Sequence, residues 1–277
     1  MVELTLILIV LIFVINGIFM ANMVKNYCDV NLCGTARNTA CNNTGQLSTS
    51  CPVGTKLFTF TAAQKQLMVD TINSYRSNLA LGASINAPGD NFPMASQMNK
   101  LQWDVEQEFM SSLQVKTCAS HDPCKNTWYN TSFFNIPMFA GQNIYYESTY
   151  APLRPPLTST ITNAVFAWYN EIIVAPVGIA DFVQTVPGRE IGHFLTMCHD
   201  QTQRVGCTGS QYEKLDRFGT NRFTQITCNF DKAPFLTLPL YKKGETCAGC
   251  LNTCDWESDS PGLCEIDPNS FANTYYF

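Results

Sequence analysis

The stretch that first specifies regular structure is residues 61–82, which read TAAQKQLMVDTINSYRSNLALG. Thr61 followed three residues later by Gln64 is the capping-box pattern that begins many helices. The apolar residues that follow recur three and four positions apart, as one face of a helix requires: Leu67, Met68, Ile72, Tyr75 and Leu79. Gly82 suits the end of this element, so the sequence predicts an amphipathic helix here.

The segments after residue 82 alternate between helix and strand patterns. Two further helices are predicted, one beginning at Asp104 and one following the proline step at residues 155–156. Their apolar faces are Val105, Phe109 and Leu113 in the first, and Ile161, Val165, Trp168 and Ile172 in the second. Strands are predicted over residues 143–150, 204–208 and 223–230. This mixed order predicts one layered α/β domain with irregular extensions at both ends.

The composition of the chain indicates a packed core and argues against a nucleic-acid partner. Charged residues make up 14% of the 277 residues, hydrophobic residues 45% and aromatic residues 12%. The net charge is −5, and no cluster of lysine and arginine provides the basic face that nucleic acids require. Disordered chains have the opposite balance of charge and apolar side chains.

Thirteen cysteines are spread along the chain, with the closest pair at Cys247 and Cys250. So many scattered cysteines are typical of disulfides formed in an oxidising compartment. A zinc knuckle at Cys247 and Cys250 is the alternative, but no second cysteine or histidine pair stands nearby at ligand spacing. An odd count leaves at least one cysteine without a partner in the same chain.

The N-terminus favours export. Residues 4–23 are almost entirely apolar, which fits a secretory signal peptide cleaved near residues 17–21, although the early charge is Glu3 rather than a lysine or arginine. A permanent membrane anchor is the alternative. Asn42 and Asn130 lie in glycosylation triplets, which agrees with export. The sequence therefore predicts a secreted, extracellular protein that contacts a membrane only during export.

Candidate chemistry is sparse. The chain has three histidines, His121, His193 and His199, and none lies in a recognised hydrolase, metalloprotease or phosphate-binding motif. From residue patterns alone, the sequence indicates a secreted, disulfide-rich globular domain.

Four short motifs in the middle of the chain add a family resemblance. They are residues 141–144 (GQNI), 168–172 (WYNEI), 192–194 (GHF) and 227–230 (TCNF). Their order and spacing resemble the signature regions of the CAP superfamily, which includes cysteine-rich secretory proteins, insect venom antigen 5 and plant pathogenesis-related proteins. Residues 73–78 (NSYRSN) resemble its first helix motif, with Ile72 where histidine is usual. The cysteine spacing within residues 26–41 and 118–124 is similar to the antigen 5 branch.

The resemblance implies a fold and a domain organisation. The fold is an α/β three-layer α-β-α sandwich. We expect a signal peptide over residues 1–21, a cysteine-rich extension over 22–60, the CAP domain over 61–235 and a cysteine-containing tail over 236–277.

The resemblance also implies a disulfide framework. The implied pairs are Cys28–Cys41, Cys33–Cys124, Cys51–Cys118 and Cys207–Cys228. The tail cysteines, whose pairing the sequence leaves open, are Cys247, Cys250, Cys254 and Cys264. Cys198 remains, and we expect a buried, inert thiol rather than a reactive one.

In the CAP superfamily two histidines and two carboxylates surround a central cleft, sometimes with a divalent ion. The matching residues here are His121, Gln142, Glu171 and His193. Gln142 replaces a more widespread glutamate, which removes a general acid and one negative charge. His121 and His193 could still hold Zn²⁺ weakly, with Glu171 or water; the alternative is a purely structural polar cluster. No cofactor is required.

The resemblance leaves the molecular action open. We expect a monomeric, non-enzymatic antigen 5-like protein of venom or saliva that binds a host protein or a small hydrophobic ligand such as a fatty acid, sterol or eicosanoid. A peptidase-like hydrolase using the cleft, and a structural or defence-related secreted protein, are the alternatives. A lipid channel between the first and third predicted helices is a further hypothesis, against the reading that both apolar faces simply pack in the core.

Overall fold

The computed structural model describes residues 25–120, 124–130 and 135–266. Its larger helices are α3 (Ala62–Ala80), α4 (Val105–Thr117), α5 (Leu157–Asn170) and α6 (Gly192–Cys198), with short helices α2 (Val30–Cys33), η1 (Glu171–Val174) and η2 (Val177–Ala180). Its strands are β1 (Lys56–Phe58), β2 (Gln102–Trp103), β3 (Thr127–Asn130), β4 (Asn135–Met138), β5 (Gly141–Thr149), β6 (Arg204–Asp216), β7 (Gly219–Phe230), β8 (Cys254–Asp255) and β9 (Leu263–Cys264).

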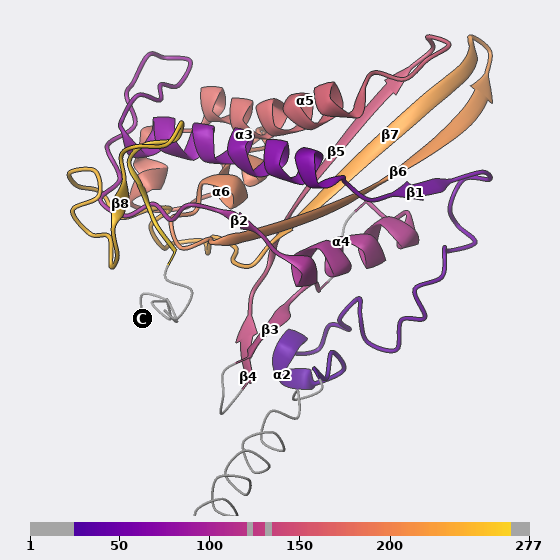
Figure 1. The fold of residues 1–277 in the computed structure, drawn as a ribbon, viewed down its shortest axis with the longest axis horizontal. Coiled ribbons are helices and arrows are strands. Elements are labelled where there is room, and N and C mark those ends of the chain that lie inside the picture. The colour runs from indigo at the N-terminus through magenta and orange to yellow at the C-terminus, as the bar shows by residue number, and fades with distance from the viewer. Residues whose placement is uncertain (1–24, 121–123, 131–134, 267–277) are drawn as a thin grey trace, which may run out of the picture.

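One sheet divides the molecule into three layers. The strands lie in the order β1-β6-β7-β5, all antiparallel to their neighbours, and β2 pairs with the start of β6 in parallel. Helix α4 covers one face of the sheet, and α3, α5 and α6 lie on the other (Figure 1). This is the α-β-α sandwich that the family resemblance implies.

Helices α3 and α5 confirm the predictions made from apolar periodicity. The capping box is present, since the Thr61 amide donates to Gln64 Oε1 at 2.9 Å and the Thr61 hydroxyl accepts from the Gln64 amide at 3.3 Å. The apolar faces of both helices are buried in the common core, including Met68, Ile72 and Trp168. Their burial favours packing over a lipid channel between the two helices.

Helix α4 begins one residue after the predicted start, with Asp104 as its N-cap, and it buries a different face. Val105 is 76% exposed and Phe109 is 46% exposed, so the predicted apolar face was wrong except at Leu113. The buried face combines apolar Met110, Leu113 and Val115 with polar side chains. Ser111 Oγ lies 2.9 Å from Thr208 Oγ1, and Thr227 Oγ1 donates to Gln114 Oε1 at 3.1 Å. Apolar periodicity cannot identify the part of a buried face that is formed by hydrogen-bonded polar side chains.

A glycine permits this close packing. A Cβ atom on Gly206 of β6 would lie 2.1 Å from the Glu108 backbone nitrogen of α4. A side chain at residue 206 would therefore push α4 off the sheet.

The β6–β7 hairpin is longer than the sequence suggests. The predicted strands, residues 204–208 and 223–230, are the inner parts of a ladder that continues to the Asp216↔Gly219 pair. In the outer half, residues 213–216 of β6 are exposed and residues 219–222 of β7 are glycine or polar, so hydrophobic patterning ends before the backbone pairing does.

Six disulfides join the described residues. The pairs Cys28–Cys41, Cys33–Cys124, Cys51–Cys118 and Cys207–Cys228 are those that the resemblance implies. The tail pairs are Cys247–Cys254 and Cys250–Cys264, which excludes a zinc knuckle at Cys247 and Cys250. Cys198 is the free cysteine and is fully buried, and burial raises the pKa of its thiol to about 12.

Asn42 is exposed in a turn after Cys41, while the Asn130 side chain lies outside the described part of the chain. Glycosylation of both residues stays a prediction. The apolar segment of residues 4–23 also lies outside it. Within the described residues, no helix combines the length and apolarity needed to cross a bilayer.

The guanidinium of Arg76 lies at the centre of the fold and has no exposed surface. It donates to the backbone oxygens of Asn99 at 2.6 and 3.1 Å, Met197 at 2.7 Å, His199 at 2.9 Å and Thr202 at 3.2 Å. Burial lowers the pKa of this group to about 10, so it stays charged at neutral pH. One side chain of α3 thus holds two separate backbone segments, at Asn99 and at residues 197–202.

We expect Arg76→Lys to lower the free energy of unfolding by about 3 kcal/mol, because an ammonium cannot reach all these carbonyl oxygens. Urea unfolding followed by circular dichroism measures the change. The matched control is Arg37→Lys, since Arg37 also donates to a backbone oxygen, that of Cys41, but is exposed. A loss for Arg76→Lys no larger than that of the control would contradict the central role of the guanidinium.

Candidate functional site

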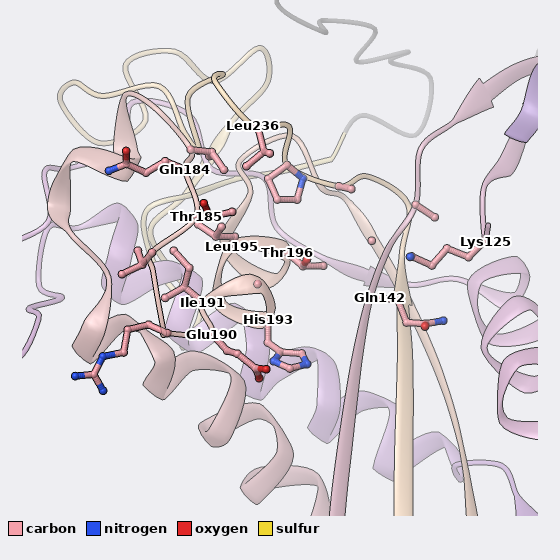
Figure 2. A pocket seen from close by; sticks show the side chains of 18 residues that line it. Lys125, Gln142, Gln184, Thr185, Glu190, Ile191, His193, Leu195, Thr196 and Leu236 are labelled. Atoms are coloured by element: carbon pink, nitrogen blue, oxygen red, sulfur yellow. The ribbon is translucent and has the colours of Figure 1, made fainter. Parts of the chain in front are cut away.

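A cleft of about 580 Å³ opens where the start of β5, the start of α6 and two loops meet. Figure 2 shows Lys125 and Gln142 on one wall, and Glu190 and His193 on the other. The loop of residues 183–191 and the segment of residues 233–236 complete the lining. Three of the four residues expected at a central cleft lie at or beside it, namely Gln142, Glu171 and His193.

His193 is fixed by its neighbours. Its Nδ1 atom lies 2.6 Å from Glu171 Oε1, and its ring stacks on that of Trp168 at 6.4 Å between centroids and 21° between planes. Its backbone oxygen accepts a hydrogen bond from Asn143 Nδ2 at 2.9 Å. These contacts leave the Nε2 edge of the imidazole as the part that can meet a ligand.

Glu171 has a structural task besides orienting His193. Its Oε2 atom accepts from the Phe194 amide at 3.0 Å, in the first turn of α6. That helix has no side-chain cap of its own, because its N-cap residue is Ile191. The carboxylate therefore satisfies a backbone donor that the sequence of the helix leaves unpaired.

Gln142 lines the same cleft but belongs to the sheet. Its Nε2 atom donates to Asn229 Oδ1 at 2.8 Å, between paired residues of β5 and β7. The adjacent Gly141 lets α6 approach this strand, since a Cβ atom there would lie 2.5 Å from Thr196 Cγ2. Gln142 thus presents a neutral amide to the cleft opposite His193.

The described residues do not make up a metal site. They contain no group of three or more histidine, cysteine, aspartate and glutamate side chains able to hold an ion. Glu171 is occupied by His193 and Phe194, and Gln142 adds no charge. His121, the second predicted ligand, lies outside the described residues. A weak zinc site and a structural polar cluster therefore both stay predictions.

Two hydroxyl-bearing residues, Thr185 and Thr196, line the cleft, but neither forms a hydrogen bond with His193. Within the described part of the chain, the imidazole of His193 makes its hydrogen bond to Glu171 and to no serine, threonine or cysteine. A serine-type hydrolase needs a hydroxyl or thiol within hydrogen-bond reach of its base. Cys198, the free thiol, is buried away from solvent.

Several cleft residues were missed by the sequence predictions. The apolar walls include Val183, Val186, Leu195 and Leu236. All but Leu195 come from irregular segments, in which no periodicity marks a shared face. Asn143 and Trp168 were quoted within motifs, yet only the structure shows that they position His193.

His199, the third histidine of the chain, lies apart from His193 in its surroundings. The residue is not among the described residues that line the cleft; it is buried, with Nδ1 3.3 Å from Thr202 Oγ1. Burial, followed by the charges of Arg76 and Lys232, lowers the pKa of His199 to about 3. The core therefore contains a neutral imidazole at physiological pH.

Comparison with known proteins establishes the family. Residues 69–230 match the family model for CAP, described as the cysteine-rich secretory protein family. The chain belongs to the CAP family. A similar curated protein is Venom allergen-1 of Aedes albopictus, 28% identical over 235 residues that cover 84% of this chain and 85% of the relative. Antigen 5 like allergen Cul n 1 of Culicoides nubeculosus is 32% identical over 193 residues, covering 66% of this chain and 81% of the relative. These relatives confirm the antigen 5 resemblance.

Solved structures support the CAP fold. The crystal structure of NaASP2 with Zn²⁺ has a TM-score of 0.56 and 24% identity, covering 77% of this chain and 99% of that one. The structure of BmVAL-1 has a TM-score of 0.57 and 19% identity, covering 75% and 96%. At these identities the likeness concerns the fold alone.

We expect Zn²⁺ to bind on the order of micromolar or more weakly, because a neutral amide at residue 142 does not offset the charge of the ion. Gln142→Glu should strengthen binding, and His193→Ala should abolish it. Titration calorimetry measures both, with Gln46→Glu as a control that makes the same charge change at an exposed residue outside the cleft. No zinc-dependent heat in either the native protein or Gln142→Glu would leave the cluster purely structural.

The buried imidazole of His199 makes stability depend on pH. Its folded-state pKa lies below the unfolded value of 6.5, so only the unfolded chain takes up the proton as the pH falls. Between pH 7 and pH 5 this should cost about 2 kcal/mol of unfolding free energy.

When the pH falls from 7 to 5, we expect the free energy of unfolding of His199→Gln to decrease by about 2 kcal/mol less than that of the native protein. Asp200, whose raised pKa of about 6 acts in the opposite direction, is present in both proteins and drops out of the difference. Urea unfolding at both pH values gives the measurement. Equal pH dependence of the two proteins would be incompatible with a buried neutral imidazole.

Proposed function

We propose that this CAP protein is an extracellular, non-enzymatic binding protein whose cleft holds a small amphipathic ligand. The observation that carries the proposal is the pairing of an apolar wall, formed by Val183, Val186, Leu195 and Leu236, with a polar end at Gln142 and His193. A volume of about 580 Å³ lies within the range of small-molecule pockets. Fatty acids and eicosanoids combine an acyl chain with one polar group and are the ligand class that this arrangement favours; a sterol is the comparison.

An extracellular location is supported by the cysteine chemistry. The described residues contain six disulfides, which persist in oxidising compartments and are rare in the cytosol. The apolar segment of residues 4–23 supplies a route of export.

The hydrogen bonds of the polar side chains in the cleft favour a binding role over hydrolysis. The base candidate His193 pairs with Glu171, and the amide of Gln142 cannot serve as a second acid. Both groups are held in place and can donate or accept a hydrogen bond from a ligand head.

The test is titration with oleate, an eicosanoid and cholesterol below their micelle or aggregation concentrations. A ligand that binds only the folded protein raises its melting temperature, and it should alter Trp168 emission because that ring stacks on His193. Leu236→Ser should weaken binding roughly tenfold, since Leu236 lines the cleft and is accessible to a ligand.

The matched control is Leu251→Ser, which removes another exposed leucine, one that lies outside the cleft. It should bind like the native protein. No stabilisation by any of the three ligands, or equal losses in the two variants, would rule out the cleft as the lipid site.

A further inference from the structure

The outer half of the β6–β7 hairpin projects beyond the helices, and the chain that leaves β5 runs beside it (Figure 1). The two segments are joined. Tyr150 Oη donates to Asp216 Oδ2 at 2.7 Å, and Arg222 Nη1 donates to the Ala151 oxygen at 2.9 Å. Residues 150–154 and 213–222 therefore form one ordered unit, which we name the two-loop tip.

The two-loop tip exposes large apolar side chains at its end. Leu215 is 82% exposed, Leu153 80%, Phe218 68% and Tyr150 48%. The rings of Tyr150 and Phe218 meet edge to face at 6.2 Å between centroids, so apolar groups of both loops share one surface. Single exposed apolar residues are common on protein surfaces, but this concentration at a projecting end has no packing role in the described structure.

Carboxylates of the tip are already occupied. Glu213 Oε1 lies 3.4 Å from Arg154 Nη1 and 3.3 Å from Arg222 Nε. Asp216 accepts hydrogen bonds from Tyr150 and from the Phe218 amide. The acidic side chains thus stabilise the tip from within.

Two cationic side chains of the two-loop tip lie over aromatic rings and form no ion pair among the described residues. Lys214 Nζ lies 5.4 Å from the ring centre of Tyr212, and the Arg217 guanidinium lies 4.6 Å from that of Phe218. Neither has a carboxylate within ion-pair distance among the described residues. In a chain of net charge −5, the projecting end presents positive charge beside apolar side chains.

We propose that the two-loop tip docks on the surface of an anionic lipid bilayer. Leu215 and Phe218 would enter the boundary between headgroups and acyl chains, while Lys214 and Arg217 remain at the level of the anionic headgroups. The apolar groups lie on a convex end: a fluid bilayer adapts to that shape, whereas a protein partner would need a matching pocket. The proposal departs from the sequence-based expectation that membrane contact is confined to export, and it is independent of a ligand in the cleft.

The test is co-sedimentation of the secreted protein with vesicles of phosphatidylcholine alone or of phosphatidylcholine mixed with phosphatidylserine. We expect binding to the anionic vesicles to be roughly tenfold stronger and to weaken as salt screens the charges. Leu215→Ser combined with Phe218→Ser should reduce binding at least about tenfold, because the apolar insertion is lost. Lys214→Gln combined with Arg217→Gln should remove the preference for phosphatidylserine.

The matched control is Leu251→Ser combined with Trp256→Ser, since these residues of the C-terminal tail are 68% and 56% exposed. It should bind vesicles like the native protein. All variants are made in the same chain, so any contribution of the N-terminal apolar segment is common to them, and melting temperatures verify that each is folded.

Three results would overturn the proposal. They are no binding of the native protein to anionic vesicles, undiminished binding of the Leu215 and Phe218 double variant, and an equal loss in the tail control. Self-association that the tip variants abolish, without vesicle binding, would assign the tip to a second copy of the chain instead.

Discussion

The arrangement of this protein depends on the short helix α6 being held at both ends by charged side chains. Arg76 donates to the backbone oxygens of Met197 and His199 at its C-terminal end, and Glu171 accepts from the Phe194 amide in its first turn. Both charges match the polarity of the helix dipole. Helix α6 has seven residues and no N-terminal side-chain cap of its own, so these contacts hold it in place. Because His193 lies in this helix, the same contacts fix its position on the cleft wall.

The disulfides act on a different part of the molecule. Cys33–Cys124 and Cys51–Cys118 fasten the N-terminal extension to segments after α4, and the two tail bonds close the C-terminal loops. Cys207–Cys228 joins β6 to β7, which are already paired. The covalent bonds therefore secure the extensions and one strand pair, whereas the buried polar contacts of Arg76, Glu171 and Asn143 organise the centre.

Two surfaces of the molecule differ in chemistry and in how they are held. The cleft is concave, and its polar residues are fixed by Glu171, Asn229 and Trp168. The two-loop tip is convex, and its apolar residues are exposed while its carboxylates bind internally. A small ligand in the first and a lipid surface at the second would use separate contacts, so the two roles can be separated by variants.

The sequence by itself determined the helices α3 and α5, because local apolar spacing and a capping box specify them. It also indicated the family, through four short motifs whose order and spacing resemble those of the CAP superfamily. It also placed Gln142, Glu171 and His193 at one cleft by resemblance. The tertiary structure decided the buried face of α4, where hydrogen-bonded Ser111 and Gln114 are buried beside apolar side chains. It also decided the full length of β6 and β7, where backbone pairing continues past the apolar pattern. It alone also decided the apolar cleft wall and the tip, since each joins residues far apart in the chain whose proximity leaves no local signal in the sequence.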